Sequence, residues 1–320
     1  MKIVLIKTGA LGDVVRTTSI ALGLQRQFNA SITWVTDKNA IPILNLDGIS
    51  FVNCEENGWQ FGDYDWVINL EDDLKWCKIA STLTVERRSG GLSDDLGNRY
   101  YSDDLSEWFG MGLLARDKNE ANRLKKANQR TFYEMLYDGL GLERPVLRPK
   151  IAYTANDWYG DLANFVAGHV GINTGAGARW KYKKWGEEQT AELCKKIHST
   201  GLTPLLIGGI EEEQRNARIA ELAGDCAVTV STYRLADFAA LISKLRLLVT
   251  SDSLALHLAT AQHIPVVAFF GPTSGSEIDL FGLGEKVETE LPCGRCYLSD
   301  CNIRPHCMES ITVDRMWTAV

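Results

Sequence analysis

Short apolar runs alternate with helix-periodic stretches through the first half of the chain. Strands are predicted at residues 2–6, 31–36 and 65–70, where apolar and β-branched residues follow one another. A helix is expected from about Asp13. Five of its residues fall on one stripe at 100° per residue: Val14, Val15, Thr18, Ala21 and Leu22. A helix with one apolar stripe is suited to packing against a sheet.

The same alternation restarts in the second half. Strand-like runs are "HVGINTGAGARW", "LTPLLIGG", "AVTVS", "RLLVTSDS" and "IPVVAFFGP", with helices expected at 186–198 and 211–222. The polar, glycine-bearing region 89–126 is predicted to be irregular, and the proline-marked stretch 143–151 is the expected linker. The pattern predicts an α/β protein with two Rossmann-like domains, residues 1–150 and 151–320, facing across a cleft.

Composition narrows the class of protein. A chain of 320 residues with 45% hydrophobic and 23% charged residues fits a soluble protein of two domains. The formal net charge of −7 argues against a general nucleic-acid partner. Residues 1–6 are too short an apolar run for a signal peptide, and no stretch approaches a membrane span of about 20 residues. We therefore expect a cytoplasmic protein.

The stretch "GALGD" joins the first strand to the first helix, as in a phosphate-binding loop. It lacks the G-x-G-x-x-G of a dinucleotide loop and the Lys-Ser/Thr pair of a Walker loop, and Asp13 stands at the helix start. A helix N-terminus favours an ionised carboxylate, which can accept a proton from an attacking hydroxyl. Asp13 is therefore a candidate general base, and a plain helix cap is the alternative.

A second turn, "INTGAGARWKYKKW", combines glycines with positive charge. Thr174 ends a strand, Gly175 and Gly177 allow backbone amides to approach oxygens closely, and lysines follow. The basic positions are Arg179, Lys181, Lys183 and Lys184. The turn is a candidate diphosphate site, and a solvated basic loop is the alternative.

A third turn, "VTSDSLALHLATA", again leads from a strand into a helix. The Ser253 hydroxyl and the first helical amides can hold a phosphate, and His257 lies one turn further on the same face as Ser253. The alternative is a cap at Asp252 and a core histidine. Together with "FFGPTSG" after the next strand, two phosphate-friendly turns suggest a nucleotide diphosphate.

Five blocks in order, over nearly the whole chain, resemble the glycosyltransferase family 9 heptosyltransferases: "IVLIKTGALGDVVRTT", "INTGAGARWKYKKW", "LLIGGIEEEQRNARIAE", "LVTSDSLALHLATAQHIPVVAFFGPT" and "CGRCYLSDCNIRPHCME". The resemblance implies a GT-B fold with an N-terminal acceptor domain and a C-terminal nucleotide-sugar domain. It implies an inverting, metal-independent transferase without a catalytic cofactor. The typical donor is ADP-L-glycero-β-D-manno-heptose, and the typical acceptor is the lipopolysaccharide inner core.

The resemblance also implies roles for individual residues. Asp13 matches the general base, Lys183 matches the lysine that neutralises the leaving diphosphate, and Thr174 matches a phosphate contact. The donor-site turn is Asp252, Ser253 and His257, the acidic position near the ribose is Glu212 or Glu213, and Tyr233 and Leu235 line the nucleobase pocket. The acceptor side comprises Gly9, Ala10, Leu11, Gly12, Glu71 and Asp72.

Two departures from the family pattern concern both substrates. Leu254 stands where the donor turn usually has glycine, so the phosphate contacts are expected to differ. The acidic run Glu71, Asp72 and Asp73 replaces a frequent Leu-Gln-Gly and would repel a phosphorylated lipid core unless the acids face away. A different nucleotide sugar, a protein or other glycan acceptor, and a non-catalytic nucleotide-sugar-binding subunit are the alternatives.

Charge elsewhere on the chain bears on the acceptor. A candidate basic counter-patch is Arg123, Lys125, Lys126 and Arg130, and a solvated helix face is the favoured interpretation of those charges. A lipid-linked acceptor would bring the protein to the inner face of the membrane as a peripheral protein. The oligomeric state is left open.

Four cysteines cluster near the end of the chain: Cys293, Cys296, Cys301 and Cys307. Thiolates at such spacing can hold a structural Zn²⁺ or iron ion. Some relatives that modify autotransporters are described as binding iron there. Reduced, packed thiols are the second interpretation and disulfides the last.

Overall fold

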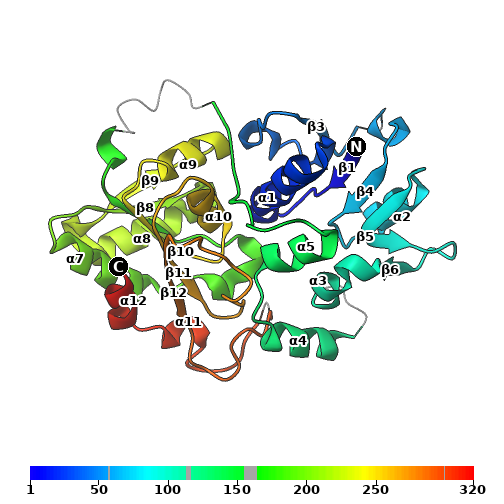
Figure 1. The fold of residues 1–320 in the computed structure, drawn as a ribbon. Helices are drawn as coiled ribbons and strands as arrows, with labels where there is room; N and C mark the ends of the chain where they lie inside the picture. The colour runs from blue at the N-terminus through cyan, green and yellow to red at the C-terminus, as the bar shows by residue number, and fades with distance from the viewer. Residues whose placement is uncertain (57, 113–116, 155–163, 299) are drawn as a thin grey trace. The chain divides into compact units, whose positions relative to one another are not determined.

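The structure is a computed structural model, and it describes residues 1–56, 58–112, 117–154, 164–298 and 300–320, the side chains of residues 178, 179 and 181 excepted. The chain forms two compact units, an N-terminal unit from Met1 to Tyr153 and a C-terminal unit from Thr154 to Val320 (Figure 1).

The N-terminal unit is built on a six-stranded sheet in the order β3-β2-β1-β4-β5-β6. Its strands are β1 (Lys2–Ile6), β2 (Ser31–Thr36), β3 (Ile49–Asn53), β4 (Trp66–Asn69), β5 (Arg87–Ser93) and β6 (Arg99–Tyr101). All pairs are parallel except β5 with β6. Ile3 lies opposite both Ile32 and Trp66, so β1 is a central strand.

Helices cover both faces of this sheet. The helices are α1 (Leu11–Phe28), α2 (Leu74–Thr82), α3 (Ser106–Gly110), α4 (Lys118–Ala127) and α5 (Phe132–Leu140). On one face α1 packs on α5, where the Tyr137 hydroxyl donates to the Ser19 carbonyl at 3.1 Å and closes over Gly23. On the other face Trp76 of α2 and Trp59 pack over Val4. This burial fixes β1 and the turn after it.

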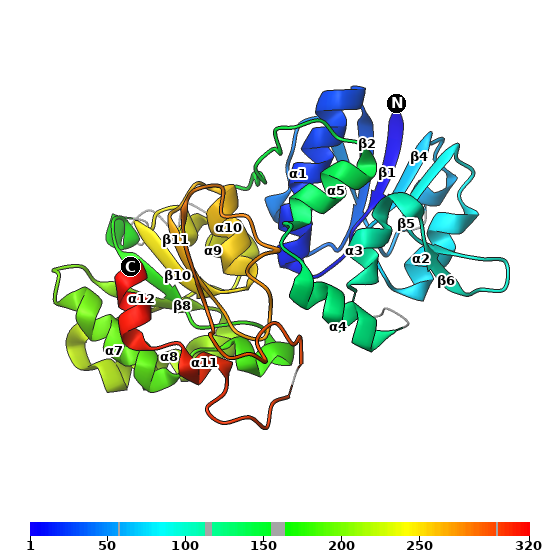
Figure 2. The same cartoon turned by 60° about the horizontal axis from the view of Figure 1, so that its bottom comes forward.

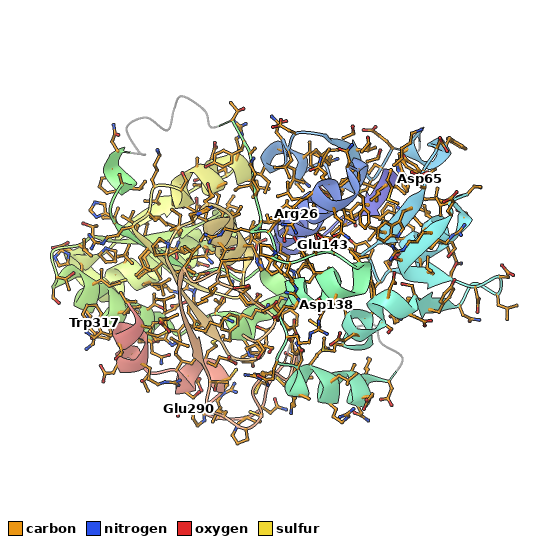
Figure 3. The ribbon with its side chains drawn as sticks, in the orientation of Figure 1. Arg26, Asp65, Asp138, Glu143, Glu290 and Trp317 are labelled. Atoms are coloured by element: carbon orange, nitrogen blue, oxygen red, sulfur yellow. The ribbon has the colours of Figure 1, made fainter. Side chains whose placement is uncertain are left out.

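The stretch that ends the N-terminal unit is held along α1 and α5. Arg26, at the end of α1, donates to the carbonyl of Glu143 at 2.5 Å and to that of Pro145 at 3.2 Å (Figure 3). Arg144 pairs with Asp138 of α5 at 2.9 Å. The proline-marked stretch therefore belongs to the N-terminal unit as far as Tyr153.

The C-terminal unit repeats the same strand order with six parallel strands, β12-β11-β10-β7-β8-β9. The strands are β7 (Val170–Asn173), β8 (Pro204–Gly208), β9 (Val228–Ser231), β10 (Leu247–Ser251), β11 (Val266–Phe270) and β12 (Gly284–Glu288). Numbered within each unit, both sheets run 3-2-1-4-5-6, the order of a Rossmann fold. The prediction of an α/β protein with two Rossmann-like domains is confirmed.

The helices of the C-terminal unit are α7 (Glu187–His198), α8 (Glu213–Ala223), α9 (Leu235–Ile242), α10 (Leu254–Ala261), α11 (Cys307–Ser310) and α12 (Val313–Ala319). Residues of α7, α8 and α12 share one apolar core with β7, β8 and β10, whereas α9 and α10 pack together elsewhere on the sheet (Figure 2). Trp185 lies in that core, next to the segment that carries Lys183.

The structure corrects one prediction of secondary structure. Region 89–126 is not irregular, because it contains most of β5, all of β6, and helices α3 and α4. Strand β5 was not predicted because Gly90 and Gly91 interrupt its sequence, and glycine is uncommon inside strands. A Cβ atom on Gly90 would lie 1.8 Å from the Asn69 carbonyl oxygen, so β5 approaches β4 where only glycine fits.

Strands β3 and β12 were not predicted, because β3 is at most partly buried after its first residue and β12 begins with three exposed residues. Within the part of the chain that the structure describes, no helix is both long and apolar enough to cross a bilayer.

Candidate functional site

Each sheet has one place where the strand order reverses, between β1 and β4 in the N-terminal unit and between β7 and β10 in the C-terminal unit. Ligands of such sheets bind outside the carboxyl ends of the strands at this topological switch point. Asp13 follows β1 in the first turn of α1, Glu71 follows β4, and Thr174 and Asp252 follow β7 and β10. The candidate residues thus form an N-terminal and a C-terminal switch-point cluster.

Asp13 is the third residue of α1 and is not its N-cap. The N-cap is Ala10, which has no side chain able to cap. The Asp13 carboxylate instead lies 2.9 Å from the Arg16 guanidinium and 3.9 Å from the Lys7 ammonium, and its side chain is 38% exposed. Two cations and the first turn of a helix all favour the ionised form, the form that a general base needs.

Arg16 is a residue of the N-terminal cluster that the sequence reasoning missed. Its guanidinium lies over the ring of Phe132 at 4.0 Å and near that of Trp108 at 5.3 Å, and the residue is buried. Water screens a buried cation poorly, so its attraction for Asp13 is strong. The spacing of three residues from Asp13 was the available signal.

Glu71 occupies the cradle that a phosphate-binding loop would offer to its ligand. One oxygen, Oε1, accepts from the backbone amides of Thr8 at 2.5 Å and Gly9 at 3.1 Å, and from the Thr8 hydroxyl at 3.0 Å. The Lys7 ammonium donates to the same oxygen at 3.1 Å. Consecutive amides of this kind form an anion-binding concavity. Here the chain's own carboxylate fills it, which explains why the loop lacks phosphate-binding residues.

The acids after Glu71 also have partners. Asp72 lies 3.3 Å from the Arg99 guanidinium and accepts from the Tyr101 hydroxyl at 2.5 Å. Burial, followed by this hydrogen bond, raises the pKa of Tyr101 well above its ordinary value. Asp73 caps α2 by accepting from the Lys75 amide at 2.8 Å. The acidic run is therefore largely neutralised within the unit.

The basic counter-patch does not form as a continuous surface. Arg123 pairs with Glu120 of its own helix at 2.6 Å, Lys125 is buried, and Arg130 pairs with Glu107 and Asp138. Of the four charges, Arg123 and Arg130 are thus paired with acids of the N-terminal unit.

At the C-terminal switch point, Lys183 and Asp252 come together from distant parts of the chain. The Lys183 ammonium lies 2.7 Å from the Asp252 carboxylate and 3.3 Å from the Asp252 carbonyl oxygen, and 4.8 Å from the centre of the Trp180 ring. Their side chains are 10% and 19% exposed. The side chains of Arg179 and Lys181, from the same basic cluster, lie outside the described residues.

A buried amide organises the donor-side turn. Asn173, the last residue of β7, donates through Nδ2 to the Ser253 hydroxyl at 3.1 Å, the Thr250 hydroxyl at 3.0 Å and the Gly175 carbonyl at 3.0 Å. The hydroxyls of Ser253 and Thr250 lie 2.9 Å apart. Ser253 is the N-cap of α10 without capping it, and Leu254 is the first helical residue. Sequence reasoning missed Asn173, which lies 80 residues from Ser253.

Thr174 and Glu212 form a second polar group beside this turn. The Thr174 hydroxyl donates to Asn216 of α8 at 2.5 Å, and the Asn216 amide nitrogen has no hydrogen-bond partner among the described residues. The Glu212 carboxylate packs against Gly175, where a Cβ atom would lie 2.6 Å from Oε1. Lys184 lies 3.9 Å from the same oxygen. A side chain at position 175 would therefore displace the Glu212 carboxylate.

The remaining predicted residues lie at the same edge of the sheet. Tyr233, 71% exposed after β9, donates to the Glu213 carboxylate at 2.6 Å, which raises the pKa of the tyrosine. Gly177 has a φ of +73°, a conformation that favours glycine. His257 is buried in α10, and Leu235 begins α9. Of the two predicted acids, Glu213 thus accepts a hydrogen bond from Tyr233, and Glu212 packs against Gly175.

Residues 61–289 match the family model described as glycosyltransferase family 9 (heptosyltransferase). The chain belongs to this family. It is therefore a glycosyltransferase, as the resemblance of the five sequence blocks implied.

Individual relatives agree with this membership. The chain is 23% identical to lipopolysaccharide heptosyltransferase 1 of Pseudomonas aeruginosa, over 95% of this chain and 88% of that protein. A glycosyltransferase family 9 structure from Veillonella parvula aligns with a TM-score of 0.73 at 18% identity, over 99% and 95% of the two chains. The E. coli ADP-heptose lipopolysaccharide heptosyltransferase II structure aligns at 0.67 and 19% identity, over 100% and 97%. These likenesses confirm the GT-B fold.

The metal site predicted at the clustered cysteines has no support among the described residues. All eight cysteines are free, which excludes disulfides in this structure, and no group of three or more His, Cys, Asp or Glu residues in the described ranges is arranged to hold a metal ion. The four thiols still lie near one another. Burial raises the pKa of Cys307 to about 11, and its three clustered neighbours add to the effect. In this structure the four cysteines are free thiols.

Proposed function

We propose that this family 9 enzyme transfers a heptose from ADP-L-glycero-β-D-manno-heptose to a hydroxyl of a lipopolysaccharide core, with inversion at the anomeric carbon. The names of the relatives support the donor and the acceptor class: lipopolysaccharide heptosyltransferase 1 and ADP-heptose lipopolysaccharide heptosyltransferase II. The observation that carries the proposal is that each switch point holds one aspartate beside one lysine, Asp13 with Lys7 and Asp252 with Lys183.

In the proposed reaction Asp13 acts as the general base. The acceptor hydroxyl gives its proton to the carboxylate, and its oxygen attacks the anomeric carbon on the face opposite the nucleotide. Lys7 and Arg16 hold the carboxylate ionised before the step. The exposed part of the Asp13 side chain is where an acceptor hydroxyl can reach it. The turn residues Gly9, Ala10, Leu11 and Gly12 would border that acceptor.

Lys183 has the complementary task on the donor. As the bond from the anomeric carbon to the phosphate oxygen breaks, negative charge collects on ADP, and the Lys183 ammonium is placed to neutralise it. In the free enzyme Asp252 holds that ammonium in place. Thr174 and the amides of Gly175 and Gly177 would contact the phosphates, and His257 would lie beneath them. The step needs no catalytic cofactor.

The nucleoside end of the donor would lie over β8 and β9. The exposed ring of Tyr233, tethered by its hydroxyl to Glu213, offers a flat surface for a nucleobase. Because Glu213 accepts a hydrogen bond from Tyr233, we assign the ribose contact to Glu212 and Glu213 together rather than to one of them.

The paired acids of the N-terminal unit bear on the acceptor. Because Lys7 and Arg99 neutralise Glu71 and Asp72, the acidic run loses much of the repulsion expected toward a phosphorylated core. This supports the lipopolysaccharide acceptor. A protein or another glycan is the alternative acceptor, and a lipid-linked acceptor would bring the enzyme to the membrane surface as a peripheral protein.

One observation favours a second candidate donor. Leu254 stands at the first position of α10, and the Ser253 hydroxyl is directed to Asn173 and Thr250. Both features differ from a turn open to phosphate, so a different nucleotide sugar is the alternative to ADP-heptose.

A comparison of ADP, UDP and GDP by thermal shift tests the donor. A ligand at a hundred times its dissociation constant stabilises the fold by about 2.7 kcal/mol, which is measurable. We expect ADP to raise Tm most. A preference for UDP or GDP would overturn the heptose donor, with Leu254 as the first residue to revert to glycine. Release of ADP from ADP-heptose by the purified enzyme would exclude the non-catalytic alternative.

A further inference from the structure

The segment from Thr289 to Ile311 carries the four clustered cysteines, and the proposed reaction gives it no task. We call it the cysteine segment; residue 299 within it lies outside the described part of the chain. It leads from β12 through an orange loop to α11 and ends ahead of α12 (Figure 2). Its contacts with the rest of the C-terminal unit include the segment that carries Lys183 and the loop after β11, the strand that pairs with β10.

Its first contact is with Tyr182, the residue before Lys183. The Tyr182 hydroxyl donates to the Cys301 carbonyl at 3.2 Å, and its ring meets the His306 ring edge-on, with centroids 5.2 Å apart. The same hydroxyl also contacts Arg304 and raises the pKa of that guanidinium. Two residues beyond Lys183, the Trp185 ring nitrogen donates to the Ile311 carbonyl at 2.9 Å. The backbone on either side of Lys183 is thus tied to the two ends of α11.

Its second contact is with the loop after β11. The Tyr297 amide donates to the Pro272 carbonyl at 2.8 Å, and the Tyr297 hydroxyl accepts from the Ser274 amide at 3.2 Å. That hydroxyl donates to the Glu277 carboxylate at 2.5 Å. Burial, and then Glu277, raise the pKa of Tyr297 well above its ordinary value, and Asp252 adds to the effect. Strand β11 pairs with β10, with Phe269 opposite Ser251, so the loop that Tyr297 contacts follows the strand beside the one that leads to Asp252.

We propose that the cysteine segment positions the Lys183–Asp252 pair to receive the donor diphosphate, through Tyr182 on the lysine side and Tyr297 on the aspartate side. The inference rests on the proposed donor site. Lys183 must move from one carboxylate partner toward phosphate oxygens, and such a group works only when its neighbours hold it to within about 0.5 Å. Tyr182 and Tyr297 are positioning residues, because neither needs to touch the donor.

Removing single hydroxyls tests this. Tyr182→Phe keeps the ring against His306 and loses the bond to Cys301, and Tyr297→Phe loses the bonds to Ser274 and Glu277. One net hydrogen bond is worth about 0.5–1.5 kcal/mol, so we expect ADP affinity to fall roughly 2- to 13-fold by calorimetry in each variant. Adenosine affinity should stay unchanged, and KM for the donor should rise more than kcat falls.

The matched control is Tyr64→Phe in the N-terminal unit. The Tyr64 hydroxyl also donates to a backbone carbonyl, that of Trp59, at 2.9 Å. This variant should leave ADP affinity unchanged while costing a similar amount of stability. Equal losses of ADP and adenosine affinity in the Tyr182 and Tyr297 variants, or no loss of either, would overturn the inference.

A double-mutant cycle separates this inference from the proposed donor site. If Lys183→Ala leaves ADP affinity unchanged, the donor site itself is wrong. If Lys183→Ala weakens ADP binding, Tyr182→Phe should add nothing in that background, because its effect passes through the lysine. A further full loss in the double variant would show that the cysteine segment acts elsewhere, and the inference would fall.

The thiols give an independent readout. Coupling between two sites is reciprocal, so ADP binding should in turn restrain the cysteine segment. We expect ADP to slow alkylation of the half-buried Cys296 and Cys301 by iodoacetamide several-fold, with Cys54 of the N-terminal unit as the internal control. Equal rates with and without ADP at all three thiols would contradict the coupling.

Discussion

The two switch points place the same pair of residue types in different electrostatic settings. At the N-terminal one, Asp13 is 38% exposed, lies 3.9 Å from Lys7 and is paired with Arg16, while Lys7 is shared with Glu71. At the C-terminal one, Asp252 is 19% exposed and lies 2.7 Å from Lys183. In the first pair the Asp13 carboxylate is accessible and Lys7 is also bound to Glu71. In the second pair the Asp252 carboxylate fixes the position of the Lys183 ammonium.

This difference indicates how one topology can serve two tasks. An exposed, ionised carboxylate suits a base that meets a neutral hydroxyl. A lysine held by a single acid can exchange that acid for phosphate oxygens. Asp13 and Lys7 both follow the first strand of their sheet, whereas Lys183 and Asp252 follow the first and fourth strands of theirs. The strand order thus sets the place of each pair, and the surrounding charges set its chemistry.

The largest effect is expected from Asp13→Asn. Removal of a general base costs typically about 100- to 10,000-fold in rate, so kcat should fall by that amount. Heptose transfer measured by ADP release checks this. Asp37→Asn, at an aspartate that directly follows β2 at the same edge of the sheet, is the control and should stay active. Turnover retained in Asp13→Asn would reduce Asp13 to a helix residue.

Lys183→Ala should have the next largest effect, on binding. A hydrogen bond to a charged group is worth about 1.5–3 kcal/mol, so ADP affinity should fall roughly 10- to 150-fold while adenosine affinity holds. Calorimetry with both ligands measures the difference. Lys195→Ala, at a surface pair with Glu192 on α7, is the control. Equal losses for ADP and adenosine would remove the phosphate role.

Lys7→Met should slow turnover by less than Asp13→Asn, about tenfold for the loss of about 1.4 kcal/mol. Without this cation the ionised form of Asp13 is less favoured, although Arg16 remains, and Glu71 gains an unbalanced negative charge. The acid limb of the kcat/KM–pH profile should therefore move to higher pH. An unchanged acid limb would show that Lys7 serves only the turn.

The smallest effect is expected from Glu187→Gln, which tests the frame around Lys183. Glu187 accepts from Arg218 and from Arg215, and Arg215 also holds the Trp185 carbonyl. The Arg218 hydrogen bonds lower the pKa of Glu187 below its ordinary 4.5. A lowered folded-state pKa stabilises above the ordinary value, and this stability is lost as pH falls through the folded value.

Glu187→Gln should therefore lower Tm at pH 7 by roughly 2–4 °C, for a loss of about 1 kcal/mol. The difference from the unmodified protein should shrink as the pH falls below 4.5. ADP affinity should change little. A difference in Tm that is independent of pH would exclude the ion pairs as its cause.

Local pattern was sufficient for much of the fold and for part of the site. The central strands are apolar runs bounded by turns. This pattern predicted β1, β2 and β4 in the N-terminal unit and β7 to β11 in the C-terminal unit. The position of Asp13 and of the Asp252 turn follows from strand–turn–helix order alone. The lysines that pair with these two aspartates do not follow from local pattern. The family resemblance pointed to Lys183, and nothing pointed to Lys7.

The rest depends on contacts between residues that are far apart in sequence. Lys7 meets Glu71 across 64 residues, and Thr174 meets Asn216 across 42, so no periodicity links them. The β5–β6 hairpin was hidden by Gly90 and Gly91, which are required by close approach to β4 and its following turn. Thiol spacing along the chain likewise gave no measure of how the four cysteines lie in space.

The most direct test of the division of labour is ADP calorimetry on Asp13→Asn and Lys183→Ala side by side. We expect Asp13→Asn to bind ADP as the unmodified enzyme does and Lys183→Ala to bind it at least about tenfold more weakly. Equal weakening in both variants, or weakening in Asp13→Asn alone, would contradict the assignment of the base to one switch point and the donor to the other.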